Sequence, residues 1–206
     1  MIIFNREKYL RLSKFSADKN NIRFYLHSVY FEPHPEKGAI GVATDGHAIL
    51  IAHDEHGKVE SPQIRPALTN AEINILKSGK CPDACVQFGA SSVRAIRALE
   101  DEDVELGITG WIPDGGPTDV KYPDWRKVLP ETFGEAATSH TIDSQLLKRF
   151  WDAGFKKGAP LTFFPGKEIF DAVCIRFESP DYFAVVMPMR HSHPINNVIP
   201  GWLEAA

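Results

Sequence analysis

The sequence predicts an α+β fold in which antiparallel sheets carry their helices on one face. A pattern of one strand, one helix and three strands begins three times along the 206 residues, near residues 2, 63 and 139. Each unit has a single helix, and its other apolar runs are short and separated by turn residues, which is typical of this fold class. The hydrophobic content of 43% with 24% charged residues indicates an ordinary soluble globular protein.

The first unit begins with a short apolar strand at residues 2–4. Asn5 can cap a helix over residues 6–15, with Tyr9 facing inward. We expect the basic side chains of this helix to face largely outward: Lys8, Arg11 and Lys14. Strand-like runs follow at residues 23–31, 39–44 and 48–53, separated by turns.

The second and third units repeat this order. An extended run at 63–67 precedes a helix from about residue 70 to 78, and strands are expected at 85–89, 93–99 and 104–109. In the third unit, residues 140–142 are expected to be extended before a helix over 144–153, which Asp143 or Ser144 caps. Strands at 161–164, 169–178 and 182–187 complete it.

The three units predict a division into two domains. Residues 1–128 form one domain of two half-repeats, 1–62 and 63–128, and residues 129–190 form a partial second domain. Residues 191–206 are a C-terminal extension.

The net charge of −4 hides two basic segments. Residues 6–23 carry six Lys or Arg against two acids, and residues 143–157 carry four against two. Two interpretations stay open, namely contact with nucleic-acid phosphates or two solvated helix faces. The stretch Asn20–Tyr25, in which aromatic and basic residues alternate, fits either stacking on nucleic acid or a strand with core aromatics.

Motifs for enzyme chemistry are missing or better explained in other ways. The loop at 110–116 lacks the Lys-Ser/Thr pair of a phosphate-binding loop. Asp45 and His47 flank Gly46, where Asp is common because its side chain bonds backbone amides, so a turn is favoured over an acid–base pair. We expect no enzymatic activity and no cofactor.

The cysteine and histidine spacings predict no metal site. Cys81 and Cys85 lack a second ligand pair, and the His191-Ser192-His193 string lacks a third ligand. Three cysteines without a secretion signal favour reduced thiols, and no apolar run is long enough to span a membrane. We therefore expect a cytoplasmic protein without a membrane partner.

Four strings together resemble one family, the bacterial DNA polymerase III beta subunit, or sliding clamp. Residues 42–47 (VATDGH) resemble the ATDGH motif of the clamp's middle domain, and residues 122–130 (YPDWRKVLP) resemble the FPDYRRVLP linker into its last domain. Residues 185–190 (VVMPMR) resemble the string with which clamps end, and RFYL at 23–26 fits a clamp RYYL string. The four strings occur in the family's order, and the resemblance covers about residues 1–190.

The resemblance implies a DNA-clamp fold and a DNA polymerase processivity factor. Such a protein is a homo-oligomeric ring that encircles duplex DNA without reading its sequence, with basic helices facing the hole and sheets outside. DNA polymerase and other partners dock a short motif, similar to Gln-Leu-x-Leu-Phe, into an apolar pocket between the last two domains, and a clamp loader is a further expected partner. The alternative is a non-encircling adaptor or competitor that keeps only the peptide pocket.

Matching positions give the residues expected at each site. Those of the peptide-binding pocket are Leu26, Thr44, Gly46, His47, Ile49, Pro123, Lys127, Val128, Val185, Met187, Pro188, Met189 and Arg190. The expected DNA contacts, from the basic segments and the aromatic stretch, are Lys8, Arg11, Lys14, Asn20, Arg23, Phe24, Tyr25, Lys148 and Arg149.

The chain also departs from the family's pattern. Ala48 lies where members usually carry arginine and Lys127 replaces another arginine, which puts the preferred partner in doubt. Nothing matches the first clamp domain, and residues 131–190 match only the second half of the last one. A ring of twelve half-domain units would then close as a tetramer of three-unit chains, or as a trimer if each chain held two complete domains. Since an open sheet edge favours a partner, we expect self-association, and residues 191–206 could cover the pocket or contact a neighbouring subunit.

Overall fold

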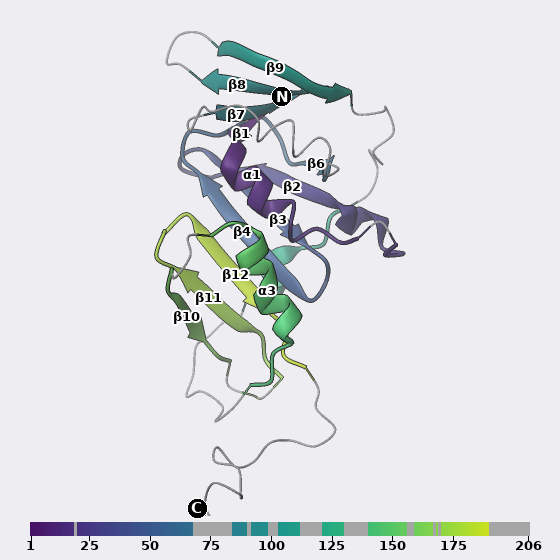
Figure 1. The fold of residues 1–206 in the computed structure, drawn as a ribbon, viewed down its shortest axis with the longest axis vertical. Helices are drawn as coiled ribbons and strands as arrows, with labels where there is room; N and C mark the ends of the chain where they lie inside the picture. Colours follow the sequence, from purple (N-terminus) through teal and green to yellow (C-terminus); the bar gives the residue numbers. More distant parts are fainter. Residues whose placement is uncertain are drawn as a thin grey trace, which may run out of the picture.

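The computed structural model describes residues 1–18, 20–67, 84–89, 92–98, 103–111, 121–129, 140–155, 159–166, 168 and 170–189. In this part of the chain the strands form two antiparallel sheets (Figure 1). The five-stranded sheet has the order β5-β1-β7-β8-β9, and the seven-stranded sheet has the order β10-β11-β12-β4-β3-β2-β6. The α+β fold class predicted from the sequence is confirmed.

The described elements are given in the order of the three units expected from the sequence. The first unit holds β1 (Ile2–Asn5), α1 (Arg6–Leu12), the 3-10 helix η1 (Phe24–His27), β2 (Ser28–Pro33), β3 (Ala39–Thr44), β4 (Ala48–Asp54) and β5 (Lys58–Val59). The second holds β6 (Gln63–Pro66), β7 (Ala84–Phe88), β8 (Ser92–Ala98) and β9 (Asp103–Trp111), and the 3-10 helix η2 (Trp125–Val128) follows it. The third holds α3 (Ser144–Asp152), β10 (Leu161–Phe164), β11 (Val173–Phe177) and β12 (Tyr182–Val186).

Several segments differ from the expectation. One is 170–172, which lies outside β11 although a strand is expected over 169–178. Residues 24–27 form η1 rather than a strand, because Asn21 bonds this segment locally: its Oδ1 accepts from the Arg23 amide at 2.9 Å, and its carbonyl lies 2.9 Å from His27 Nε2. Residues 140–143 form no strand. The last α-helical residue of α1 is Leu12, after which the Ser13 hydroxyl donates back to the Tyr9 carbonyl. The helix expected over residues 70–78 lies outside the described residues.

The first two units exchange their leading strands. β1 begins the first unit but pairs with β7 of the second, with Phe4 opposite Val86. In return, β6 begins the second unit but pairs with β2 of the first, with Tyr30 opposite Ile64. The leading strand of each unit therefore lies beside the second strand of the other unit.

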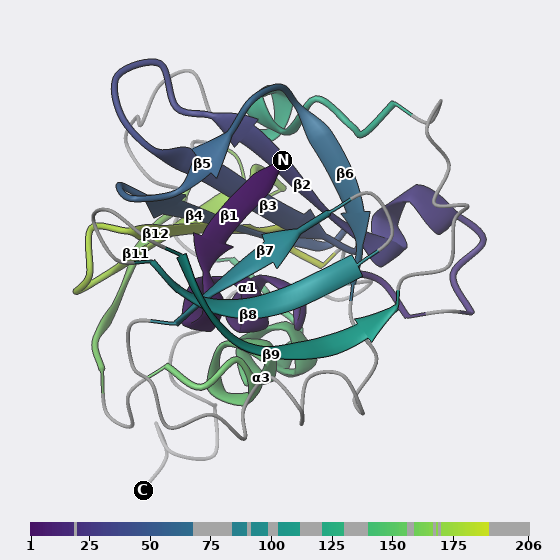
Figure 2. The ribbon, with the colours of Figure 1, turned by 90° about the horizontal axis from the view of Figure 1, so that it is seen from above.

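The third unit joins the first through strand pairing. β12 pairs antiparallel with β4, with Ala184 opposite Leu50, so the sheet continues without a break from one unit into the other. α1 and α3 lie on the same face of this sheet (Figures 1 and 2), where the rings of Phe15 and Phe150 meet edge to face at 5.1 Å. We call this junction, formed by β4, β12, α1 and α3, the seam.

Two basic residues of α1 lie within the seam, which corrects the expectation that they face largely outward. The Lys8 and Arg11 side chains are only 14% and 15% exposed. Lys8 Nζ lies 2.8 Å from Asp181 Oδ2 and donates to the His53 carbonyl at 2.6 Å. Arg11 donates to the Tyr182 hydroxyl at 2.7 Å and also pairs with Glu7. Both side chains reach acceptors in the third unit because β12 lies beside β4.

An ion pair from α3 also crosses the seam. Arg149 Nη2 lies 2.6 Å from Oδ2 of Asp45, in the turn between β3 and β4, and the Asp45 side chain is 10% exposed. Burial of Asp45 opposes its ionisation, but the hydrogen bonds from Arg149 and from the Ala48 and His47 amides outweigh it. Together they hold the pKa of this carboxyl below its ordinary value.

Removing this ion pair is expected to destabilise the fold. Arg149→Met keeps most of the apolar stem but leaves the Asp45 carboxylate buried without its cation, and should lower the free energy of unfolding by about 2 kcal/mol. Lys148→Met is the matched control on the same helix, because Lys148 is 59% exposed and pairs with Asp152 only on the surface. Urea unfolding measures both, and an equal loss in the two variants would contradict the assignment.

The same ion pair predicts a pH dependence. Since the pKa of Asp45 is lowered on folding, its stabilisation is present above the unfolded-state pKa of about 3.9 and is lost as the pH falls through the folded-state value. The stability difference between the parent chain and Asp45→Asn should be full at neutral pH and shrink in acid. Urea unfolding across this pH range checks it, and a difference that does not change with pH would count against the charge interaction.

Candidate peptide-binding pocket

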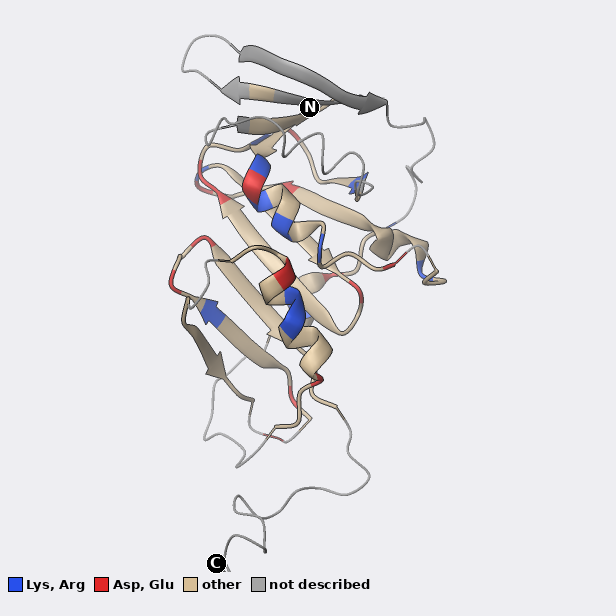
Figure 3. Ribbon diagram, viewed as in Figure 1, with Lys and Arg blue, Asp and Glu red and all other residues tan. Residues whose placement is uncertain are grey.

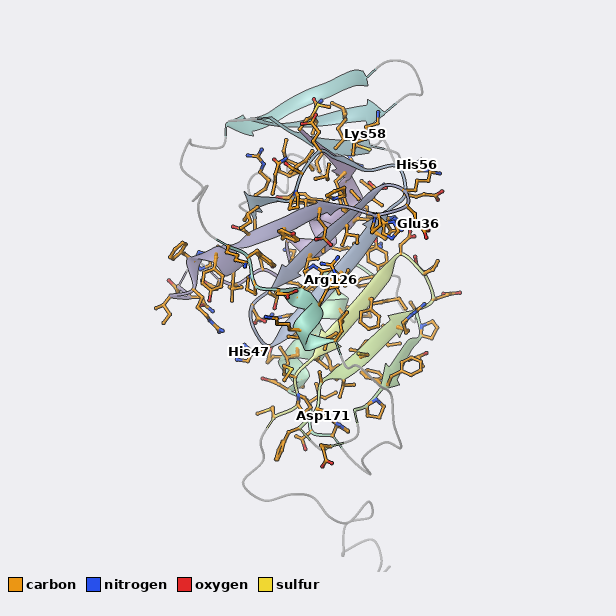
Figure 4. The ribbon with its side chains drawn as sticks, turned by 180° about the vertical axis from the view of Figure 1, so that it is seen from behind. Glu36, His47, His56, Lys58, Arg126 and Asp171 are labelled. Carbon is orange, nitrogen blue, oxygen red and sulfur yellow. The ribbon has the colours of Figure 1, made fainter. Side chains whose placement is uncertain are left out.

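A cavity of about 290 Å³ lies where the linker at 121–129 covers the seam. Figure 4, seen from behind Figure 1, shows η2 across the seven-stranded sheet, on the face opposite α1 and α3. The cavity is lined by Arg23, Tyr25, Leu26, Thr44, Gly46, His47, Ala48, Ile49, Tyr122, Pro123, Asp124, Trp125, Val128, Val185 and Met187. All three units or their linkers contribute to it, so this cavity exists only because the seam is closed.

Nine of the thirteen expected pocket residues lie on this lining: Leu26, Thr44, Gly46, His47, Ile49, Pro123, Val128, Val185 and Met187. Lys127, Pro188 and Met189 are not among the lining residues. The Lys127 side chain is 81% exposed and lies 3.9 Å from the Asp124 carboxylate, and the Met189 amide donates to the Thr141 carbonyl at 2.7 Å. Arg190 lies outside the described residues. The role of these residues in peptide binding stays a prediction.

The turn between β3 and β4 forms one wall, and hydrogen bonds fix its shape. The Asp45 carboxylate accepts from the His47 and Ala48 amides at 2.9 and 3.0 Å, while the Thr44 hydroxyl donates to the Ala48 carbonyl at 2.8 Å. Gly46 has φ +94°, so a side chain there would strain the backbone, and its Cβ would also displace the Arg23 guanidinium, whose Nη1 lies 2.8 Å from that position. The Met187 amide donates to the His47 carbonyl at 2.9 Å, which ties the end of β12 to this wall.

The linker that forms the opposite wall is held by aromatic packing and an ion pair. Tyr122 is buried, stacks on Tyr30 with ring centroids 5.2 Å apart and donates to the Val42 carbonyl. Arg126 lies over the Trp125 ring at 4.1 Å and makes a two-point contact with the Glu32 carboxylate of β2, at 2.5 and 3.3 Å. Burial and the hydrogen bond to Glu32 raise the pKa of Tyr30 to about 12, so its hydroxyl stays neutral beside the carboxylate.

Several lining residues were missed or assigned elsewhere. The sequence-based expectation assigns Arg23 and Tyr25 to DNA, whereas the structure places both on the pocket lining. Tyr122, Asp124 and Trp125 also line it, and they stand within the YPDWRKVLP string. Taking that whole string as pocket wall would have found them.

Asp45 and His47 are not arranged as an acid–base pair. His47 Nδ1 lies 3.7 Å from Asp45 Oδ2, which is too long for a hydrogen bond, and that carboxylate oxygen pairs instead with Arg149. Asp45 holds the turn, as the sequence indicates. Within the part of the chain that the structure describes, no group of three His, Cys, Asp or Glu side chains could hold a metal ion, and no helix is long and apolar enough to cross a membrane.

The expected DNA contacts divide into two groups. Lys8, Arg11 and Arg149 have internal partners across the seam, which leaves them poorly placed for phosphate contacts. Lys148 and Phe24 are 59% and 54% exposed, and Asn20 is also exposed; Lys14 is partly so. Figure 3 shows acidic and basic residues mixed along α1 and α3, rather than a uniformly basic surface.

No protein-family model matches the chain, and no curated protein sequence does either. Solved structures do match. The DNA polymerase III beta subunit of Thermotoga maritima gives a TM-score of 0.59 at 14% identity, over 93% of this chain and 66% of that one. The sliding clamp of Pseudomonas aeruginosa, solved with a ligand, gives 0.60 at 16% identity over 92% and 65%. The clamp of Bartonella birtlesii, bound to griselimycin, gives 0.61 at 14% identity over 92% and 66%.

These matches concern the fold. This chain spans less than two thirds of the length of each of these clamps, and at such low identity the likeness does not extend to activity or partners. The likeness nevertheless includes nearly the whole chain. Over 92–93% of its length, this chain therefore has the fold of a bacterial DNA polymerase III beta subunit, the sliding clamp.

Proposed function

We propose that the chain is a sliding-clamp-like processivity factor that tethers DNA polymerase and other partners through a short peptide bound in the pocket. The observation that carries this proposal is the cavity at the seam, lined by nine of the residues that match the family's motifs. On this proposal the chain assembles into a ring around duplex DNA and has no enzymatic activity.

The chemistry of the lining suits an apolar peptide with polar anchors. Ile49 and Val185 form a buried floor, while Val128 and Met187 are 41% and 40% exposed at its edge. Burying one leucine or phenylalanine side chain of a peptide there is worth about 1.5–3 kcal/mol. A methionine at the edge adapts to side chains of different shape, which suits a pocket with several partners. Arg23 and His47 supply polar groups at the rim.

A charge placed in the pocket should weaken peptide binding. Met187→Asp is expected to weaken a Gln-Leu-x-Leu-Phe peptide by about tenfold or more, because the peptide's apolar side chain would then bury a carboxylate. Fluorescence polarisation with the labelled peptide measures the affinity.

Phe163→Asp is the matched control for this experiment. Phe163 is 42% exposed, close to the 40% of Met187, but lies on β10 and not on the pocket lining. Its affinity for the peptide should equal that of the parent chain. If both variants weaken peptide binding equally, or if neither weakens it, the pocket assignment is refuted.

DNA association should depend on the helix face of the sheet. Lys148→Glu on α3 is expected to weaken duplex binding at low salt and to reduce the slope of log K against log salt by about one unit, as for one lost phosphate contact. Lys127→Glu is the control, because it reverses one exposed charge on η2, on the opposite face of the sheet. Electrophoretic mobility shifts across a salt series measure both, and equal effects would argue against a DNA-facing helix layer.

The second candidate function is the non-encircling adaptor. It is favoured by the internal pairing of Lys8, Arg11 and Arg149, which removes three expected phosphate contacts. A chain that binds the peptide but binds no duplex at low salt would select this function over the ring.

A further inference from the structure

The first two units show how units of this fold complete one another. β1 of the first unit lies between β5, which follows its own three strands, and β7 of the second unit. β6 of the second unit pairs with β2 of the first. The exchange is reciprocal, and it also buries the helix: Tyr9 of α1 is fully buried, and its ring meets Phe88 of β7 at 5.1 Å.

The third unit has the leading segment of such an exchange. Residues 140–143 enter α3 as β1 enters α1, directly through the capping residue, and the two caps share one backbone conformation: φ −56° and ψ 128° at Asn5, φ −62° and ψ 123° at Asp143. The Thr141 carbonyl accepts from the Met189 amide, just after β12, much as β1 pairs with β5 just after β4. This segment therefore already has the inner neighbour that β1 has.

The third unit also has the receiving strand, and within the described residues no strand lies beyond it. β10 is the first of its three strands, as β7 and β2 are in the other units, yet it lies at the edge of the seven-stranded sheet (Figure 1). Within the described part of the chain, no strand pairs with its outer edge, and residues 140–143 pair with no strand of another unit. Both halves of one exchange are thus present in a single unit, and among the described residues neither pairs with a strand of another unit.

Several apolar side chains of the third unit are also exposed. Counted from the capping residue, Leu147 of α3 corresponds to Tyr9 of α1, but it is 37% exposed where Tyr9 is fully buried. Trp151, one turn further on, is 61% exposed. Phe163 of β10 lies opposite Ile175, a residue of the core on the helix side, and is 42% exposed. Exposed apolar residues in a unit that also has an open sheet edge are typical of an interface.

We propose that two copies of this chain join through their third units by the same reciprocal exchange. Residues 140–142 of each copy add to the outer edge of β10 of the other, and Leu147 of each packs against the other's β10. The occupant is a second copy because the donor segment and the receiving edge belong to the same unit, so a two-fold axis satisfies both at once and closes the interface.

The interface between the two third units would be one of the contacts from which a ring is built, and this part rests on the proposed function. Two chains joined in this way hold six units, all of them paired. The dimer is argued from the exchange geometry alone. Only the further step, in which such dimers form parts of a ring, depends on the proposed function.

The test is the mass of the full chain in solution, measured by light scattering across the micromolar range. The expected mass is a multiple of two chains of 23.0 kDa. Leu147→Asp and Phe163→Asp should each weaken the dimer by about tenfold or more, since a carboxylate would be buried at the interface. Ile22→Asp, which changes a residue that is 94% exposed on another surface, should leave the mass unchanged.

Peptide affinity, measured on the same samples, shows that the variants are folded and separates the two proposals. A dimer that is lost in both variants while peptide binding persists supports the exchange. A dimer that survives both substitutions overturns it, because another surface must then form the interface. A monomer also overturns it, and slow hydrogen exchange at residues 161–164 in that monomer would identify a segment of the same chain as the occupant. A monomer that binds the peptide leaves the pocket proposal standing, and a dimer that does not bind it leaves only the exchange.

Discussion

The antiparallel pairing of β12 with β4 is the interaction on which the rest of the structure depends. It makes one sheet from two units that are more than a hundred residues apart in the chain. On one face of that sheet it brings α3 against α1, and on the other it brings Val185 and Met187 against the turn at Asp45. The core and the pocket are therefore two sides of the same strand pairing, and a change that opens the seam should remove both.

Charged residues at this junction hold the units together. Lys8 and Arg11 of α1 bond Asp181 and Tyr182 of the third unit, and Arg149 of α3 bonds Asp45 of the first. Because these side chains are mostly withdrawn from water, losing one partner costs more than losing a surface ion pair. The same residues look, in the sequence alone, like a basic surface for DNA. Their use within the seam explains how a chain with a net charge of −4 can carry two basic helices without a uniformly basic face.

The elements that depend on local sequence were predictable, and those that depend on distant partners were not. The alternation around Asp45-Gly46 predicts β3, the turn and β4, because turn chemistry and strand pattern both lie within residues 39–54. The strings at 122–130 and 185–190 predict pocket residues through resemblance. The burial of Lys8 was not predictable, since its partner Asp181 is far along the chain. η1 differs from the expected strand because the side chain and carbonyl of Asn21 compete for the local backbone, which an apolar pattern does not register.

On the proposed function, closing the seam builds a peptide-binding pocket from separate parts of the chain. Hydrogen exchange of the full chain with and without a Gln-Leu-x-Leu-Phe peptide tests this most directly. Bound peptide is expected to slow amide exchange in all three segments that line the pocket, residues 44–49, 122–128 and 185–187. Exchange in α1 should change little. If the peptide slows amide exchange in only one of these segments, or only outside all three, the pocket is not built as proposed.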